Sequence, residues 1–168
     1  MPSAQASSEP DPGTETTSGD VPDNAVFLAY RDSAQAFSIQ YVEGWQVVPR
    51  SDGVTIRDKD SSETVAIVPA PTDIASWASG TDLRALQALP GFKLIKQDTV
   101  QVGSAVLTHI SYHVPAPPDP VTGKQVPSTV DRYYVRGPRG LAVISLSTPD
   151  GVDNVDAFRQ MIESFSWT

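Results

Sequence analysis

The sequence contains no cysteine, which excludes disulfide bonds, zinc–thiolate sites, iron–sulfur clusters and cysteine nucleophiles. It also lacks any run of about 18–20 apolar residues, the length that a membrane-spanning helix needs. Basic residues are few, with 12 Lys and Arg against 20 Asp and Glu. The resulting net charge of −8 argues against a nucleic-acid-binding protein, because such domains carry clustered Lys and Arg.

The chain of 168 residues has the length of one domain with a tail. Residues 1–24 hold five acidic residues and four prolines but no Lys or Arg, and they have too little apolar surface to offset the entropy of ordering. We therefore predict a disordered acidic linker over 1–24 and a single domain over 25–168. The domain carries a net charge of −3, from 15 acidic and 12 basic residues.

The composition of the linker bears on where the protein acts. In many bacterial lipoproteins a spacer of this kind separates a lipidated cysteine from the folded domain. We therefore expect an extracytoplasmic protein that a lipid anchors to the membrane in the full-length chain. A cytosolic protein with an irregular terminus is the alternative.

Alternating apolar and polar residues predict strands from residue 26 onward, with Phe37, Ile39 and Tyr41 on one apolar face. A short helix is expected to begin at Thr81 or Asp82 and to end before Pro90. The strands are expected at residues 26–31, 37–41, 47–48, 54–57, 64–68, 92–102, 105–114, 129–136 and 141–147.

The C-terminal region has the clearest helical pattern. Asp153 or Asn154 can cap the helix, and one apolar side carries Val155, Phe158, Ile162 and Phe165. Hairpins and two helices in this order predict an α+β fold with a mostly antiparallel sheet.

The segment that reads AFSIQYVEGW, residues 36–45, resembles the opening motif of PsbP-like proteins. The final Phe165-x-Trp167 after a helix is also similar to that family, whereas Val42 stands where the family usually has proline. From the residues alone, we expect Trp45 to close the end of the core. The matching positions are Tyr30, Asp32, Phe37, Ser38, Ile39, Tyr41, Gly44 and Trp45.

The resemblance implies an α/β/α sandwich around an antiparallel sheet and a non-enzymatic, extracytoplasmic protein. Members of the family include extrinsic subunits and assembly factors of photosystem II. Similar folds occur in mycobacterial envelope lipoproteins and in a eukaryotic factor that binds a small nuclear-transport GTPase. Since one fold serves such different tasks, the fold alone does not choose among them.

Two functions remain open at this point. The first is a monomeric, non-catalytic accessory or assembly protein for a membrane complex, with a photosynthetic role that depends on the organism. The alternative is an envelope lipoprotein that binds or carries a lipid or another small apolar ligand. A large apolar pocket would favour the carrier, and a closed core with an exposed interaction patch would favour the accessory protein. Clustered carboxylates in a cleft would instead favour a third class, an enzyme.

Motifs for catalysis and cofactor binding are missing. The sequence has no Gly-x-Ser-x-Gly elbow and no phosphate-binding loop, and the region Asp58–Glu63 lacks the glycine of a calcium loop. We interpret residues 58–63 as a solvated turn. No catalytic, cofactor-binding or metal-binding residue is therefore assigned, and no cofactor is expected.

Basic side chains recur on two predicted strands and form one candidate interaction face. His109 and His113 lie on one strand about 13 Å apart, which is too far to bind one metal ion together. Arg132 and Arg136 join them if the next strand has the same orientation, and Arg139 lies at the following turn. Such a face would recognise an anionic head group or an acidic partner. A solvated or salt-bridged sheet face, with Asp131 as one partner, is the alternative.

The loop of residues 115–128 is the second candidate for an interaction. Its five prolines reduce the entropy that docking would cost, although a stiff connection without any partner is equally consistent with them. The candidate residues are Pro117, Pro118, Asp119, Pro120 and Lys124.

Overall fold

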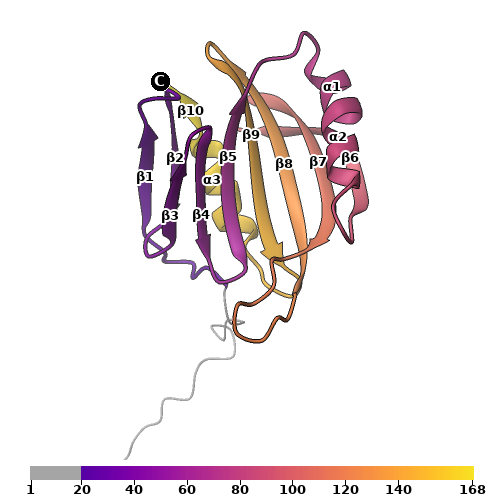
Figure 1. Ribbon diagram of the computed structural model, residues 1–168. Helices are drawn as coiled ribbons and strands as arrows, with labels where there is room; N and C mark the ends of the chain where they lie inside the picture. The colour runs from indigo at the N-terminus through magenta and orange to yellow at the C-terminus, as the bar shows by residue number, and fades with distance from the viewer. Residues whose placement is uncertain (1–19) are drawn as a thin grey trace, which may run out of the picture.

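The computed structural model describes residues 20–168, and its strands form two antiparallel sheets (Figure 1). The larger sheet has the strand order β3–β4–β5–β9–β8–β7–β6, and the smaller has the order β1–β2–β10. The strands are β1 (Phe27–Asp32), β2 (Phe37–Val42), β3 (Gln46–Arg50), β4 (Gly53–Asp58), β5 (Ser61–Val68), β6 (Lys93–Val102), β7 (Ala105–Pro115), β8 (Pro127–Gly137), β9 (Gly140–Pro149) and β10 (Ser166–Trp167).

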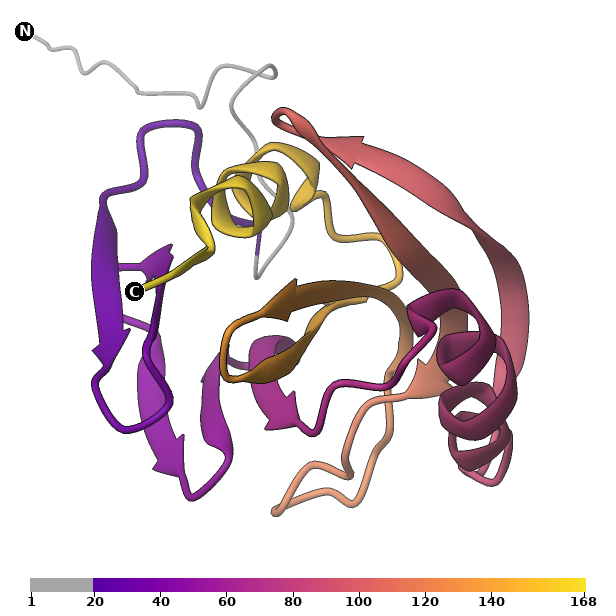
Figure 2. The same cartoon turned by 90° about the horizontal axis from the view of Figure 1, so that it is seen from above.

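Helices cover both faces of the larger sheet (Figure 2). Helix α3 (Val155–Ser164) packs on the face that carries Ile144, and the two share one core. A continuous helical segment packs on the opposite face, against Val143. This segment consists of α1 (Ile74–Trp77), the π-helical turn η2 (Ala78–Asp82) and α2 (Leu83–Gln87). The predicted α+β fold, an α/β/α sandwich around an antiparallel sheet, is confirmed.

The residues that carry the family resemblance lie mainly in the core. Phe37 and Ile39 are fully or almost fully buried, and Trp45 is only 8% exposed, as expected for a side chain that closes the core. Gly44 has a φ of 94°, a left-handed conformation that favours glycine and lets the chain turn before Trp45. Phe165 stacks on Phe37 with ring centroids 5.7 Å apart. The motif therefore acts as a structural element.

The start predicted for the first helix is wrong. The helical segment begins at Ile74, where Asp73 Oδ1 accepts a hydrogen bond from the Ser76 N–H at 3.0 Å. Gly80 interrupts the apolar pattern in the sequence, but the π-helical turn continues the segment through it. Asp82 is consequently not a capping residue but a buried side chain, 7% exposed, that faces the sheet.

Asn154 stands at the predicted N-cap of α3, but its side chain caps no helical N–H. Its Oδ1 accepts from the Val21 N–H at 3.1 Å, and its Nδ2 donates to Ser61 Oγ at 3.1 Å. Val155 is 62% exposed, so it is not on the buried side of α3 as predicted, whereas Phe158 and Ile162 are. Asn154 thus connects α3 to β5 and to the first described residues.

Of the predicted linker, residues 1–24, the first 19 residues lie outside the described part of the chain. Residues 20–24 pack against the domain. The contact of Val21 with Asn154 and a hydrogen bond from the Asp153 N–H to Asp20 Oδ1, at 3.2 Å, hold them beside the start of α3. The domain therefore includes residues that composition alone assigns to the linker.

The prediction of a solvated turn at residues 58–63 is wrong for residues 61–63. Ser61–Val68 form β5, and Glu63 is fully buried between its cross-strand neighbours Ile56 and Leu146. Polar side chains at Ser61 and Glu63 conceal the period-two pattern of the strand. No helix within residues 20–168 is both long and apolar enough to cross a membrane.

Candidate functional site

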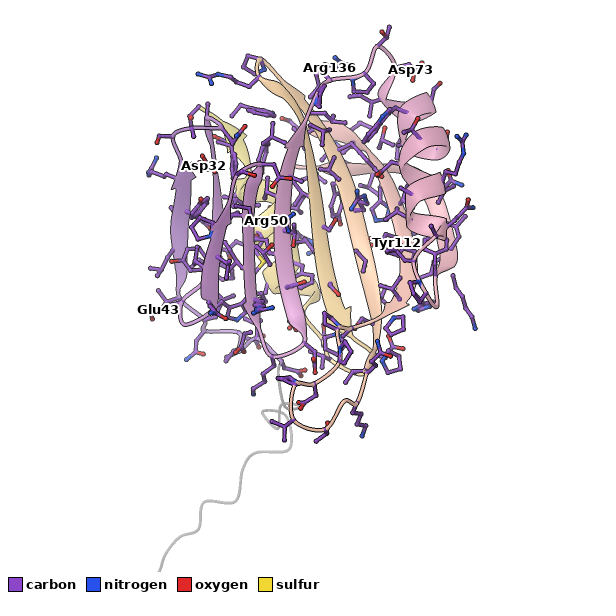
Figure 3. The ribbon with its side chains drawn as sticks, viewed as in Figure 1. Asp32, Glu43, Arg50, Asp73, Tyr112 and Arg136 are labelled. Carbon is purple, nitrogen blue, oxygen red and sulfur yellow. The ribbon has the colours of Figure 1, made fainter. Side chains whose placement is uncertain are left out.

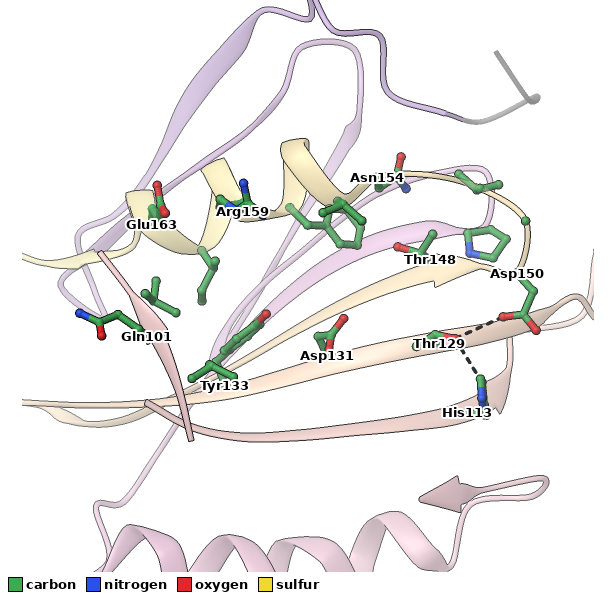
Figure 4. Close-up of a pocket in the computed structure, with 18 residues that line it drawn as sticks. Gln101, His113, Thr129, Asp131, Tyr133, Thr148, Asp150, Asn154, Arg159 and Glu163 are labelled. Atoms are coloured by element: carbon green, nitrogen blue, oxygen red, sulfur yellow. Dashed lines mark hydrogen bonds between the residues drawn. The ribbon is translucent and has the colours of Figure 1, made fainter. Parts of the chain in front are cut away.

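A cavity of about 540 Å³ lies between α3 and the concave face of strands β6 to β9 (Figure 4). Its apolar lining includes Val100 and Val102 from β6, Tyr133 from β8, and Phe158 and Ile162 from α3. Small-molecule sites have volumes of about 300–1,000 Å³, so the cavity is large enough for a ligand.

The sequence builds this lining through strand alternation. Thr129, Asp131 and Tyr133 are two residues apart on β8, so all three side chains point toward α3. The register places Tyr133 beside His109 of β7, which in turn lies opposite Asp98 of β6. The wall of the cavity thus combines an aromatic ring with charged side chains.

His109 lies on the same face of the sheet as Tyr133 and has a carboxylate beside each ring nitrogen. Nδ1 is 2.7 Å from Asp98 Oδ1, and Nε2 is 2.7 Å from Asp131 Oδ1. The side chain of His109 is only 4% exposed, and its ring lies 4.9 Å from that of Tyr133. Because carboxylate oxygens only accept, both ring nitrogens must donate, and the ring is therefore an imidazolium.

The electrostatics agree with this protonation state. Burial of the ring opposes the positive charge, but the hydrogen bonds to Asp131 and Asp98 outweigh it and raise the pKa of His109. The hydrogen bond from His109 also lowers the pKa of Asp98. Burial, followed by the nearby charges of Asp131 and Asp98, raises the pKa of Tyr133 to about 12. Tyr133 therefore remains a neutral phenol.

The end of the cavity near the start of α3 has a second polar group (Figure 4). The Thr129 hydroxyl donates to Asp150 Oδ1 at 3.2 Å, and its oxygen lies 3.1 Å from His113 Nδ1. In a hydrolytic triad the carboxylate would orient the histidine, whereas here it binds the hydroxyl. This arrangement can hold a polar ligand group but does not activate Thr129 as a nucleophile.

Helix α3 adds charges of both signs to the rim. Arg159 and Glu163 line the cavity, but Arg159 also has an ion pair with Asp156 at 3.7 Å. Asp131 is paired with the His109 imidazolium, and the carboxylates of Asp150 and Glu163 line the cavity with one guanidinium that already has an anionic partner. The charge of the lining favours a cationic or hydrogen-bond-donating group over an anion.

The structure does not place the predicted basic side chains on one face. Arg132 is opposite Ile110, on the side of the sheet that α1 and α2 cover, whereas His109 and His113 point toward α3. Arg132 forms two hydrogen bonds with Asp82, of 2.8 and 3.0 Å, and Tyr134 donates a third to that carboxylate. The Asp82 carboxylate thus holds Arg132 on the side of the sheet opposite to the two histidines, and the predicted single basic face is wrong.

Arg136 and Arg139 are exposed, but both form hydrogen bonds with backbone carbonyl oxygens of the same chain. Arg136 donates to the carbonyl oxygens of Pro71 and Thr72, close to Asp73 at the start of α1 (Figure 3). Arg139 donates to the Ala34 carbonyl oxygen at 3.4 Å. The single basic face required the histidines of β7 and the arginines of β8 to point to the same side of the sheet. They point to opposite sides.

The proline-rich loop occupies residues 116–126 and extends from the same end of the sheet as the first described residues (Figure 1). Asp119 Oδ1 accepts from the N–H groups of Val121 and Thr122 at 2.8 and 2.9 Å, which lowers the pKa of Asp119. Val121 is 90% exposed. The candidate residues Pro117, Pro118, Asp119, Pro120 and Lys124 are all exposed.

Sequence reasoning missed the cavity and the role of Asp98. Period two does indicate that Asp98, Val100 and Val102 share one face of β6, but it does not identify their partners. The register and the position of α3 bring together residues from 98 to 163, and neither can be derived from one strand. Within residues 20–168, no three His, Asp or Glu side chains are grouped so that they could hold a metal ion.

The sequence matches no protein-family model and no curated protein. Solved structures do match. Cyanobacterial PsbP from Synechocystis is 17% identical with a TM-score of 0.57, over 89% of this chain and 98% of that chain. The Ran-binding protein Mog1p of Saccharomyces cerevisiae is 13% identical with a TM-score of 0.55, over 86% of this chain and 96% of that chain.

A third match is LpqN, a protein involved in cell envelope biogenesis of Mycobacterium tuberculosis. It is 13% identical with a TM-score of 0.50, over 87% of this chain and 92% of that chain. The chain therefore has the PsbP-like fold that the motif at residues 36–45 predicted. Identities this low establish the fold and leave the function to the site.

Proposed function

We propose that the chain is a non-catalytic, extracytoplasmic binding protein that holds a small ligand with an apolar body between α3 and the sheet. The observation that carries this proposal is the cavity of about 540 Å³. Val100, Tyr133 and Phe158 supply apolar surface, and the polar groups at both ends can orient a ligand. Of the two functions that the sequence leaves open, the cavity favours the carrier.

The arrangement of polar groups supports a binding role rather than catalysis. The Thr129 hydroxyl lies beside His113, but His113 is exposed and no carboxylate within residues 20–168 orients its ring. His109 has both nitrogens engaged by Asp98 and Asp131, so neither is free to accept a proton from a substrate.

The extracytoplasmic location and the lipid anchor are parts of the same proposal. The acidic, proline-containing composition of residues 1–19 supports a tether. One match of the same fold, LpqN, is a protein of cell envelope biogenesis, which supports a site of action in the envelope. We therefore propose that the protein is a monomer and that its partner is a lipid or a membrane-associated complex.

Filling the cavity tests the binding function. We expect Val100→Trp to weaken binding of the uncharged apolar dye N-phenyl-1-naphthylamine by about tenfold or more, because the indole would occupy the space beside Tyr133. The measurement is a fluorescence titration. Val106→Trp is the matched control, since Val106 is 65% exposed and does not line the cavity. Equal affinity for wild type and Val100→Trp would contradict the proposal.

The exposed, internally hydrogen-bonded loop at 116–126 favours a second candidate function, an accessory protein that docks on a membrane complex through this loop. Asp119 and the prolines fix the loop before any partner binds, which lowers the entropic cost of docking.

Loosening this loop tests the accessory role. The triple variant Pro117→Ser, Pro118→Ser, Pro120→Ser should lower the free energy of unfolding by only about 1–3 kcal/mol but abolish chemical cross-linking to a complex in native membranes. Pro49→Ser, at an exposed proline of β3, is the control. Unchanged cross-linking of the triple variant would exclude docking through the loop.

A further inference from the structure

The charge on one wall of the cavity depends on a single buried proton. Asp131 lines the cavity with a side chain that is 39% exposed, and the ion pair that it forms is with the imidazolium of His109. Removing one proton from His109 leaves a ring that can donate from only one nitrogen. The other nitrogen would then face a carboxylate oxygen at 2.7 Å with its lone pair, so one of the two hydrogen bonds must break.

We propose that His109 is a proton switch that controls Asp131 and thereby couples pH to the binding of a ligand with a cationic head group. While His109 is protonated, it holds Asp131 against the sheet and neutralises it. When Nε2 loses its proton to solvent, Asp131 is free to bind the cation. This inference rests on the proposed ligand-binding function, because the cation is part of the ligand in the cavity.

The surroundings of the two carboxylates indicate which hydrogen bond breaks. Asp98 Oδ2 lies 3.6 Å from the Lys96 ammonium, so Asp98 keeps a cationic partner beside its hydrogen bond from Nδ1. Within residues 20–168, Asp131 has no ion pair except that with His109. The proton is therefore lost from Nε2, on the side of the cavity, and the net charge of the three side chains changes from −1 to −2.

Beyond Asp98 and Asp131, the other ionisable groups around the cavity also favour a cation. They are Lys96 on β6, His113 on β7, the neutral Tyr133 on β8, Asp150 after β9, and Arg159 and Glu163 on α3. Asp150 and Glu163 add negative charge, and Arg159 is shared with Asp156. Once Asp131 is released, carboxylates dominate the polar lining, and a cationic head beside the apolar wall is the complementary ligand.

Linkage gives the sign of the pH dependence. The contacts with Asp131 and Asp98 keep His109 protonated above the ordinary imidazole pKa of 6.5. The ligand-competent form, with Asp131 free, is therefore the minor form at lower pH. Affinity for a cation rises with pH by up to about tenfold per unit and becomes constant when His109 has lost its proton. Reciprocally, a bound cation promotes deprotonation of His109.

Nuclear magnetic resonance of the full chain tests the switch without any ligand. Between pH 6 and 9, the His109 ring nitrogens and the Asp131 carboxyl carbon should change with the same midpoint. In His109→Gln the transition of the Asp131 carboxyl carbon should be absent, and in the control Glu43→Gln, a variant of an exposed residue far from the cavity, it should persist. An Asp131 signal that stays constant while His109 titrates would overturn the proposal.

Calorimetric titration with two probes tests the ligand class. Decyltrimethylammonium is cationic, and decyldimethylamine N-oxide has the same chain without net charge over this pH range. We expect the affinity for the cation to rise about tenfold or more between pH 6 and 9, whereas that for the N-oxide changes less than about twofold. Both His109→Gln and Asp131→Asn should abolish the rise.

The outcomes separate the two proposals. If both probes bind but the wild type and His109→Gln have the same pH profile, the switch is wrong and the ligand-binding function stands. If neither probe binds, the proposed binding function is contradicted, and the ligand step of this inference fails with it. A rise with pH for the cation that requires both His109 and Asp131 supports the inference.

Discussion

Replacing Arg132 with methionine is expected to lower the free energy of unfolding by about 3–5 kcal/mol. Arg132 binds Asp82 with two hydrogen bonds between β8 and the helical segment, and the two side chains are only 20% and 9% exposed. Methionine occupies a similar volume but leaves the Asp82 carboxylate buried without its cation. Urea denaturation, compared at constant m-value, measures the loss.

Two further variants distinguish a buried ion pair from a general effect of the substitution. Arg136→Met should change stability by less than about 1 kcal/mol, because Arg136 is exposed and its partners within residues 20–168 are backbone carbonyl oxygens. The triple variant Arg132→Met, Asp82→Leu, Tyr134→Phe should recover most of the loss, since neither charge of the ion pair nor the Tyr134 hydroxyl stays buried. If Arg132→Met is as stable as wild type, the ion pair is not a stabilising element.

Sequence patterns located most of the fold because the strands of this domain have clear boundaries. Gly103 lies in a tight turn and Gly140 directly follows one, both with positive φ, so the two hairpins could be identified directly. The helical segment was harder to place. It carries Ser79 and Gly80, which are typical of loops. Its residue Asp82 contacts Arg132, which is 50 residues away in the sequence, so no local pattern indicates the contact.

The site could be predicted much less well than the fold. The identification of His109 and His113 as notable residues required only their scarcity and their spacing. Whether Arg132 joins them depends on strand register, because a shift of one residue moves a side chain to the other face. In the structure Tyr133, not Arg132, lies beside His109. A cavity between a helix and a sheet depends on packing, which no local pattern contains.

Glu63 provides the second prediction with a large effect. This side chain is fully buried between Ile56 and Leu146, and neither carboxylate oxygen has a hydrogen-bond partner among the described residues. Burial therefore raises the pKa of Glu63 well above its ordinary value of 4.5. We expect Glu63→Met to increase the free energy of unfolding at pH 7 by about 2–4 kcal/mol, since it removes an unsatisfied group and its cost of protonation.

The pH dependence of this gain identifies its cause. The folded state keeps the Glu63 proton, whereas the unfolded chain loses it above pH 4.5, so the wild type is destabilised as pH rises toward the raised pKa of the folded state. The loss is about 1.4 kcal/mol per pH unit within that window. Urea denaturation at several pH values should therefore show Glu63→Met gaining relative to wild type as pH rises.

Glu63→Gln keeps the shape and polarity but removes the proton, so its stability relative to Glu63→Met should not depend on pH. Glu43→Gln, at an exposed glutamate, serves as the matched control and should stay within about 0.5 kcal/mol of wild type. A stability difference between wild type and Glu63→Met that is the same at pH 4.5 and pH 7 would contradict a protonated Glu63 in the core. Subtraction between variants removes the contribution of His109, which all of them share, and so isolates the buried carboxyl group.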